Sequence, residues 1–406
     1  MTGASPGPTA APAAPARGGA SAERMLATVR ELAADVYTGR RIGTPGGRAS
    51  AAWLADQLRT LGATVRLDEF EVAGVKELQA TPTLTIGQQA LVHRRDFAEQ
   101  LTSAEIPVPG SGLLATAEAE SWTGRWVAVE AADQQVVERA CADKAAGLLV
   151  PRGVDEAGWM PKMIAGPPAG EIAVLSVRAG LYAGLARRAG ETVTASIPLR
   201  TVATTGANVY GVFAAPTGSR LSVLLTAHFD GVGDDPQQRH PAAADNASGV
   251  AVVLEVARLL SAELPPAVGL AVALLDGEEA GARGSAHHAP QLAAGTFVLN
   301  VDGAARLGAA AAVEAGGPAE LLLAAVDQAG RRTGVPLRAG PMASDNRRYA
   351  AAGLPAIGIG MGMPGYQTPA ETPDKVEGRT LLAAAALIRA TVDHLIETSA
   401  QLGETP

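Results

Sequence analysis

The segment 221–249 constrains the fold more strongly than any other part of the chain. It opens with an unbroken apolar run over 221–225, which is typical of a strand buried on both faces. Apolar residues over 250–260 then recur at helical spacing. A histidine and two carboxylates lie at the ends of the loop between them: His228 and Asp230 follow the strand, and Asp245 precedes the helix. This pattern predicts a strand, a loop and a helix of an open α/β sheet, with these side chains at the carboxyl end of the strand, where ligands bind in such sheets.

Acidic residues also follow two later predicted strands. The apolar segment 268–275 is followed by Glu278 and Glu279, and the segment 297–301 is followed by Asp302. Acids placed close together repel one another unless protons, hydrogen bonds or a cation stabilise them. Histidine with carboxylates is a ligand set that suits zinc. A lone histidine would more often be a core residue, but the convergence of these strand ends favours a metal site.

The alternation of helices and strands divides the chain into two kinds of segment. Predicted helices and strands alternate over 23–75 and again over 201–398, which we expect to form one discontinuous catalytic domain. Between them, 76–200 contains short β segments and turns, and we expect an inserted domain there. The Pro-, Ala- and Gly-rich segment 1–22 is expected to be a disordered tail. The expected fold is α/β, with a mixed, mostly parallel central sheet, helices on both faces, and a smaller β-rich α+β inserted domain.

Composition excludes some classes of partner. The formal net charge of −8, without a basic cluster, argues against a nucleic-acid partner. No apolar run reaches the ~18 residues that a membrane span needs, and the tail lacks the apolar centre of a signal peptide. The single cysteine, Cys141, permits no internal disulfide. Localisation stays open between the cytoplasm and, if a signal precedes this sequence, the cell envelope or exterior. The oligomeric state also stays open.

Six short motifs occur in order along the chain: AHFD (227–230), ADNASGV (244–250), DGEEAGARGS (276–285), NVDG (300–303), SDN (344–346) and YQTPAETPDKV (366–376). In this order and spacing they resemble the co-catalytic zinc aminopeptidases, a family that includes aminopeptidase Y and is related to glutamate carboxypeptidase and the transferrin receptor. The segment 76–200 resembles a protease-associated domain. The resemblance implies the zinc-exopeptidase fold, one or two Zn²⁺ ions, and hydrolysis of a peptide or small amide.

The resemblance also implies roles for individual residues. The implied zinc ligands are His228 and Asp302 on one ion, Asp245 between the two ions, and Glu279 on the second. The implied catalytic residues are Glu278 as general base, Asp230 as the residue that orients His228, and Tyr366 as the stabiliser of the oxyanion. A cis peptide bond is implied between Asp245 and Asn246. Asp345 and Glu371 are candidates for binding the substrate amine.

One residue departs from the family pattern. Gln367 stands where the family has a histidine ligand of the second metal, and a neutral amide oxygen is a poorer zinc ligand than imidazole. Gln367 is therefore expected to coordinate weakly, to leave the second site empty, or to mark a retired site. His240, in the same loop as Asp245, is an alternative ligand, although solvent exposure is the simpler expectation for it.

The expected function is that of a metallo-aminopeptidase, a zinc-dependent hydrolase that removes an N-terminal residue from peptides. The first alternative is a catalytically impaired or non-catalytic binding protein on a peptidase fold, because of Gln367. The second alternative is a mono-zinc acyl-transfer enzyme of the glutaminyl cyclase type.

Overall fold

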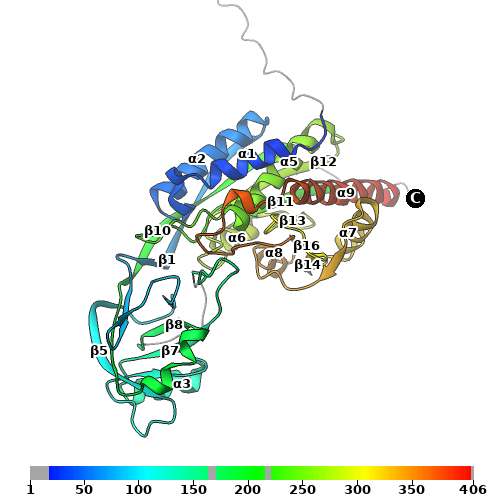
Figure 1. The fold of residues 1–406 in the computed structure, drawn as a ribbon. Helices are drawn as coiled ribbons and strands as arrows, with labels where there is room; N and C mark the ends of the chain where they lie inside the picture. The colour runs from blue at the N-terminus through cyan, green and yellow to red at the C-terminus, as the bar shows by residue number, and fades with distance from the viewer. Residues whose placement is uncertain (1–17, 163–170, 215–220, 404–406) are drawn as a thin grey trace, which may run out of the picture.

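The computed structural model describes residues 18–162, 171–214 and 221–403. Its central sheet has eight strands (Figure 1). In spatial order they are β1 (Thr64–Leu78), β10 (Leu199–Ala214), β12 (Val268–Leu275), β11 (Leu221–His228), β13 (Phe297–Val301), β16 (Ala356–Gly360), β14 (Ala311–Gly316) and β15 (Leu337–Ala339). The neighbouring pairs β12–β11, β11–β13, β13–β16 and β14–β15 are parallel, and the other three are antiparallel. The predicted mixed, mostly parallel sheet is confirmed.

Helices cover both faces of this sheet. One face carries α1 (Ala22–Leu32), α2 (Pro45–Thr60), α5 (Ser248–Glu263), α7 (Glu320–Thr333) and α9 (Gly378–Gly403). The other face carries the short helices α6 (Arg283–His288) and α8 (Asn346–Ala351). Successive side chains of β11 point to opposite faces, so Val223 and Leu225 pack under α5 whereas Leu224 packs with Tyr349 of α8. Burial on both faces explains why this strand is continuously apolar.

A second eight-stranded sheet is built from residues between 83 and 197. Its strands in spatial order are β3 (Gln89–Ala90), β2 (Thr83–Ile86), β9 (Thr192–Ile197), β5 (Ile106–Thr116), β6 (Arg125–Ala128), β7 (Gly147–Arg152), β8 (Val174–Arg178) and β4 (Phe97–Glu99). Two short helices accompany it, α3 (Gln134–Ala142) and α4 (Ala179–Tyr182). It has apolar clusters of its own and forms the cyan and green lobe of Figure 1. That this lobe is a protease-associated domain stays a prediction.

Two long antiparallel strands connect the lobes. β1 and β10 pair from Thr64 opposite Val212 to Leu78 opposite Leu199, with a register shift between Val72 and Val75. Five short 3-10 or π turns lie between the longer elements of the described residues: Asp35–Arg40, Leu185–Arg188, Ala243–Ala247, Ala289–Gln291 and Pro373–Lys375. No helix in the described ranges is long and apolar enough to cross a membrane.

The predicted tail over 1–22 lies mostly outside the described residues. Within the described part, α1 begins at Ala22, and Ser21 caps it by accepting a hydrogen bond from the backbone N–H of Arg24. The backbone N–H of Ser21 donates to Glu255 of α5. The start of α1 is thereby attached to α5, the helix that follows the loop between His228 and Asp245.

Replacing Glu255 with Gln is expected to destabilise the fold by about 1–3 kcal/mol. Burial raises the pKa of Glu255, but hydrogen bonds from Arg24, Arg258 and the Ser21 N–H outweigh it and lower the pKa to about 2. Because the folded pKa is depressed, this stabilisation is present above the unfolded value of ~4.3 and is lost as pH falls towards about 2. Urea unfolding at pH 7 and pH 3 tests this, and equal destabilisation at both values would contradict it.

Candidate metal centre

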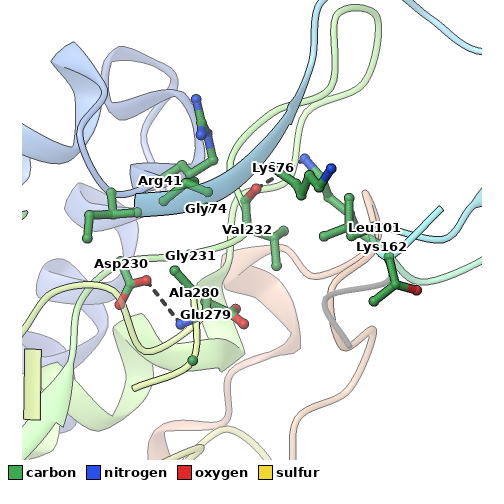
Figure 2. A pocket seen from close by; sticks show the side chains of 14 residues that line it. Arg41, Gly74, Lys76, Leu101, Lys162, Asp230, Gly231, Val232, Glu279 and Ala280 are labelled. Atoms are coloured by element: carbon green, nitrogen blue, oxygen red, sulfur yellow. Dashed lines mark hydrogen bonds between the residues drawn. The ribbon is translucent and has the colours of Figure 1, made fainter. Parts of the chain in front are cut away.

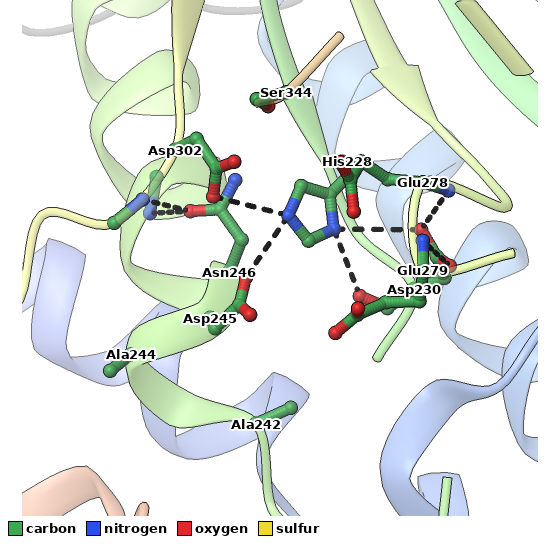
Figure 3. A network of polar contacts seen from close by, with 12 residues as sticks. His228, Asp230, Ala242, Ala244, Asp245, Asn246, Glu278, Glu279, Asp302 and Ser344 are labelled. Carbon is green, nitrogen blue, oxygen red and sulfur yellow. Dashed lines mark hydrogen bonds and ion pairs between the residues drawn. The ribbon is translucent and has the colours of Figure 1, made fainter. Parts of the chain in front are cut away.

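The carboxyl ends of β11 and β13 bring the predicted metal ligands together. His228 is the last residue of β11, and Asp302 directly follows β13. Asp245 lies in the turn Ala243–Ala247 that leads into α5. Because β11 and β13 are parallel neighbours, the residues at their carboxyl ends meet at one edge of the sheet. Figure 3 shows Asp245 and Asp302 on the same side of the His228 ring, both facing the same ring nitrogen.

The three side chains form a compact donor set. Nε2 of His228 lies 3.1 Å from Oδ1 of Asp245 and 3.2 Å from Oδ1 of Asp302. One ligand atom from each residue falls within 4.8 Å of the others, and all three residues are buried. Nδ1 of His228 lies 3.2 Å from the main-chain oxygen of Asp230. That oxygen can only accept, so Nδ1 carries the hydrogen and the lone pair of neutral Nε2 faces two carboxylates. Only a positive charge at this point, a proton or a metal ion, stabilises such an arrangement.

Without a metal, that positive charge is a second proton on His228. Burial alone lowers the pKa of His228, but the negative charge of Asp302 and hydrogen bonds to Asp230, Asp245 and Asp302 raise it well above its usual value. A cation bound to Nε2 would replace this proton. The donor set therefore fits a metal ion.

Asp230 does more than the sequence predicted. Its Oδ1 lies 3.5 Å from Nδ1 of His228, which fits the expected orienting role. Its two oxygens also accept hydrogen bonds from the backbone N–H groups of Glu278 and Glu279, at 3.0 and 3.2 Å. Asp230 thus fixes the turn after β12 that carries both glutamates.

Glu278 and Glu279 lie beside the donor set in an acidic, buried environment (Figure 3). Burial, together with neighbouring acids, raises the pKa of both carboxyls well above the usual range. Oε1 of Glu279 is buried and has no hydrogen-bond partner among the described residues. An unpartnered buried carboxylate oxygen beside Asp245 is suited to a second cation.

Gln367 reaches Glu279 with its amide nitrogen. Nε2 of Gln367 donates to Oε2 of Glu279 at 3.2 Å and to the hydroxyl of Tyr366 at 2.8 Å. An amide nitrogen cannot bind a cation, so coordination by Gln367 requires the amide to turn over and present its oxygen. Its role as a ligand stays a prediction. The compact donor set does not include it.

Glu371 does not have the role of a substrate-binding acid that the sequence suggested for it. Its Oε1 accepts the backbone N–H groups of Ala244 and Asp245 at 2.9 and 2.6 Å, and its Oε2 accepts that of Gln367 at 2.7 Å. It therefore holds the backbone at Asp245 and Gln367 and is not available for a substrate amine. Asp345 is also buried and accepts from Ser285 at 2.5 Å, but its Oδ2 has no partner among the described residues. Asp345 stays a candidate for binding an amine.

Arg40 is a buried residue of the site that the sequence did not indicate. Its guanidinium, which is not exposed at all, donates to the main-chain oxygens of Leu32, Phe229, Pro241 and Ala242 at 2.6–2.9 Å. It thus fixes both ends of the loop between His228 and Asp245. Burial lowers its pKa to about 10, although nearby acids favour the cation. The sequence does not indicate this role, because the carbonyl partners of Arg40 lie up to 202 residues away.

The expectation that His240 is exposed is wrong. His240 is 1% exposed, and its Nε2 lies 3.8 Å from Asp235. Asp235 in turn forms ion pairs with Arg94 and Lys162, which belong to the second lobe. The donor set that contains Asp245 does not include it. The peptide bond between Asp245 and Asn246 is cis, as the resemblance implies.

A cavity of about 350 Å³ lies beside Glu279 and Asp230 (Figure 2). Both lobes contribute to its lining. Its apolar walls are formed by Ile42, Val75, Leu101, Val232 and Ala280. The three cations on its wall are each paired with an acid: Arg41 with Glu77, Lys76 with Glu105 and Lys162 with Asp235. The cavity is therefore suited to an apolar group that approaches the acidic residues.

Replacing Glu371 with Gln is expected to weaken both metal binding and the fold. The amide offers one acceptor oxygen in place of two, so a backbone N–H at Asp245 or at Gln367 loses its partner, at a cost of about 1–3 kcal/mol. Zinc affinity and urea unfolding measure the effect. Glu377→Gln, in the same segment and partly exposed, is the control. If the two variants behave alike, Glu371 does not have this role.

The fold and the site together define an α/β protein with a buried acidic metal-binding centre at the carboxyl edge of its sheet. Residues 208–392 match the model of peptidase family M28. This part of the chain is therefore a peptidase family M28 domain. No curated protein matches the chain.

Solved structures share the fold over nearly the whole chain. The aminopeptidase from Aneurinibacillus sp. strain AM-1 has a TM-score of 0.70 at 20% identity and covers 92% of this chain and 93% of its own. The zinc aminopeptidase BSAP from Bacillus subtilis has a TM-score of 0.71 at 20% identity, with 91% and 94% covered. A glutaminyl cyclase from Porphyromonas gingivalis is similar at a TM-score of 0.52 and 15% identity, with 92% and 98% covered. At these identities the likeness establishes the fold.

Proposed function

We propose that this protein is a zinc-dependent exopeptidase that hydrolyses an N-terminal residue from peptides. The observation that carries the proposal is the convergence of His228, Asp245 and Asp302 at the sheet edge of a peptidase family M28 domain. Two solved structures of the same fold are named as aminopeptidases, one of them a zinc enzyme, which supports this direction.

Zinc would be held by His228, Asp245 and Asp302, with Glu279 and a turned Gln367 available to a second ion. When bound, the metal would polarise the substrate carbonyl and lower the pKa of an attacking water. The buried acids around His228 outnumber the cations among the described residues that face them, Arg40 included. This imbalance favours one or two divalent ions.

Glu278 is the proposed general base. Its raised pKa suits a group that takes a proton from the attacking water, holds it, and delivers it to the leaving amine. Asp230 keeps Glu278 in place through the backbone N–H of that residue. Tyr366, whose hydroxyl contacts Gln367, would donate a hydrogen bond to the oxyanion. Burial and the nearby acids raise the pKa of this hydroxyl, so it stays protonated and able to donate.

The substrate is proposed to be a peptide or small amide with an apolar N-terminal side chain. The cavity beside Glu279 is lined mainly by apolar groups, and its cations are neutralised by their own partners. An acidic side chain would find no unpaired cation among these three residues. Asp345 is the candidate for binding the substrate amine.

Metal stoichiometry, measured beside hydrolysis of Leu-p-nitroanilide, tests the proposal. We expect activity that depends on about one to two zinc ions per chain. Absence of both tight metal binding and hydrolysis would favour a non-catalytic binding protein. Cyclisation of a peptide with N-terminal glutamine, without hydrolysis of Leu-p-nitroanilide, would favour the glutaminyl cyclase alternative.

A further inference from the structure

Lys162 is a lysine of the second lobe that is buried against the metal-binding domain. It lies in the connection between β7 and β8, and its side chain is 7% exposed. Nζ donates to the main-chain oxygens of Val232 and Gly233, both at 3.1 Å, and lies 3.0 Å from Oδ1 of Asp235. These three partners belong to the loop between His228 and Asp245. One ammonium group thus makes two hydrogen bonds and one ion pair with a single loop of the metal-binding domain.

The backbone at Lys162 also contacts the segment that carries Tyr366 and Gln367. The N–H of Lys162 donates to the main-chain oxygen of Gln367 at 2.9 Å. Seven residues earlier, Asp155 accepts a hydrogen bond from the hydroxyl of Thr368 at 2.8 Å. The second lobe therefore contacts both loops that flank Glu279, one through the Lys162 side chain and one through its backbone.

A buried ion network fixes this arrangement from the side of the second lobe. Arg94 lies 2.6 Å from Asp235 and 2.5 Å from Glu99, at the end of β4, and all three side chains are at most 1% exposed. Asp235 is shared by Arg94 and Lys162. Two buried cations and two buried acids balance one another, so this contact is built to hold the lobes together without an unpaired charge.

We propose that Lys162 is a positioning residue for the catalytic site, through which the second lobe holds the Tyr366–Gln367 segment in its active place. The inference rests on the proposed function. The backbone conformation at Gln367 makes this support relevant, because Gln367 has a left-handed φ of 55°, which non-glycine residues adopt only when their surroundings hold them there. Glu371 accepts a hydrogen bond from the N–H of Gln367, and the backbone N–H of Lys162, whose position the buried side chain fixes, donates to the carbonyl oxygen of Gln367. The peptide units on both sides of Gln367 are therefore held by buried partners.

The main test compares Lys162→Met with Lys162→Arg in the full-length, zinc-loaded protein. Displacement of the catalytic groups by about 1 Å costs up to ~10²-fold in rate, so we expect Lys162→Met to lower kcat for Leu-p-nitroanilide by about 10- to 100-fold with a smaller change in KM. Lys162→Arg keeps the charge and is expected to recover most of kcat. Lys144→Met, the same change at an exposed lysine of the second lobe, is the control.

Hydrogen exchange gives a second measurement that does not depend on activity. Amides within 362–372 are expected to exchange faster in Lys162→Met than in the wild type or in Lys144→Met. If Lys162→Met does not fold, Asp155→Ala removes the contact with Thr368 and is expected to lower kcat in the same direction. A folded Lys162→Met variant with wild-type kcat would overturn the inference. A wild type that does not hydrolyse the substrate would instead overturn the proposed function.

Discussion

Glu278→Gln is expected to abolish turnover of Leu-p-nitroanilide while leaving the zinc content unchanged. The amide has nearly the shape of the carboxyl, and the backbone N–H of residue 278 would still donate to Asp230. What the variant loses is the ability to accept a proton from water, and general acid–base catalysis contributes about 10²–10⁴-fold. The measurement is kcat together with zinc per chain.

The control for this experiment is Glu320→Gln, the same change on the exposed surface of α7. It should retain the kcat of the wild type. Wild-type activity in Glu278→Gln would contradict the assignment of the base. Loss of zinc from Glu278→Gln would instead place Glu278 among the metal ligands.

Removal of metal is expected to destabilise the protein strongly, and more so at higher pH. Burial, with Asp230 and Asp302 nearby, raises the pKa of Asp345 to about 7, against the effects of His228 and Ser285. A carboxyl with a raised folded pKa binds protons more tightly in the folded state. Its favourable contribution is therefore complete at low pH and is lost as pH rises from the unfolded value of ~3.9 through about 7. The metal-free protein should melt at progressively lower temperature between pH 5 and pH 8.

Zinc should remove most of this pH dependence, because a bound cation stabilises the ionised acids. With free zinc at ~1,000 times its Kd, the folded state gains about 4 kcal/mol. Thermal unfolding with zinc or with a chelator, across this pH range, measures both effects. Asp302→Asn, which weakens the donor set, should reduce the gain from zinc. Equal melting temperatures with and without zinc would contradict the presence of a tight metal site.

The elements that position the metal site were predictable because each carries its own local signal. The strands predicted over 268–275 and 297–301 have these bounds in the structure. The start of each apolar run marks the first residue of the strand, and the acidic residues after the run mark its end. The helical spacing of apolar residues over 23–37 predicts one helix there, whereas α1 ends at Leu32. Thr38 and Gly39 adopt left-handed backbone angles there, within the turn that carries Arg40 to its buried position.

Residues that act through distant partners were not predictable in this way. Arg40 and Lys162 look like ordinary surface cations in the sequence. Their partners are main-chain oxygens and an acid that only the assembled fold brings to them. The burial of His240 was not predictable for the same reason, because its neighbour Asp235 is paired with Arg94 and Lys162 of the second lobe. The sequence shows that residue 371 is an acid, which makes it a candidate for a substrate contact. It does not show that three backbone N–H groups donate hydrogen bonds to this carboxyl.

The pairing of β1 with β10 has a consequence for protein engineering. Lys76 lies opposite Thr201 in this ladder, so the chain departs from the central sheet and returns to it at adjacent positions. A tight turn in place of residues 79–198 would close an ordinary hairpin and leave the register of the sheet intact. The geometry of this ladder therefore allows the second lobe to be deleted without a change in the pairing of β1 with β10. The minimal protein obtained in this way would lack Lys162, and we expect it to require compensating substitutions around Gln367 before it matched the parent in turnover.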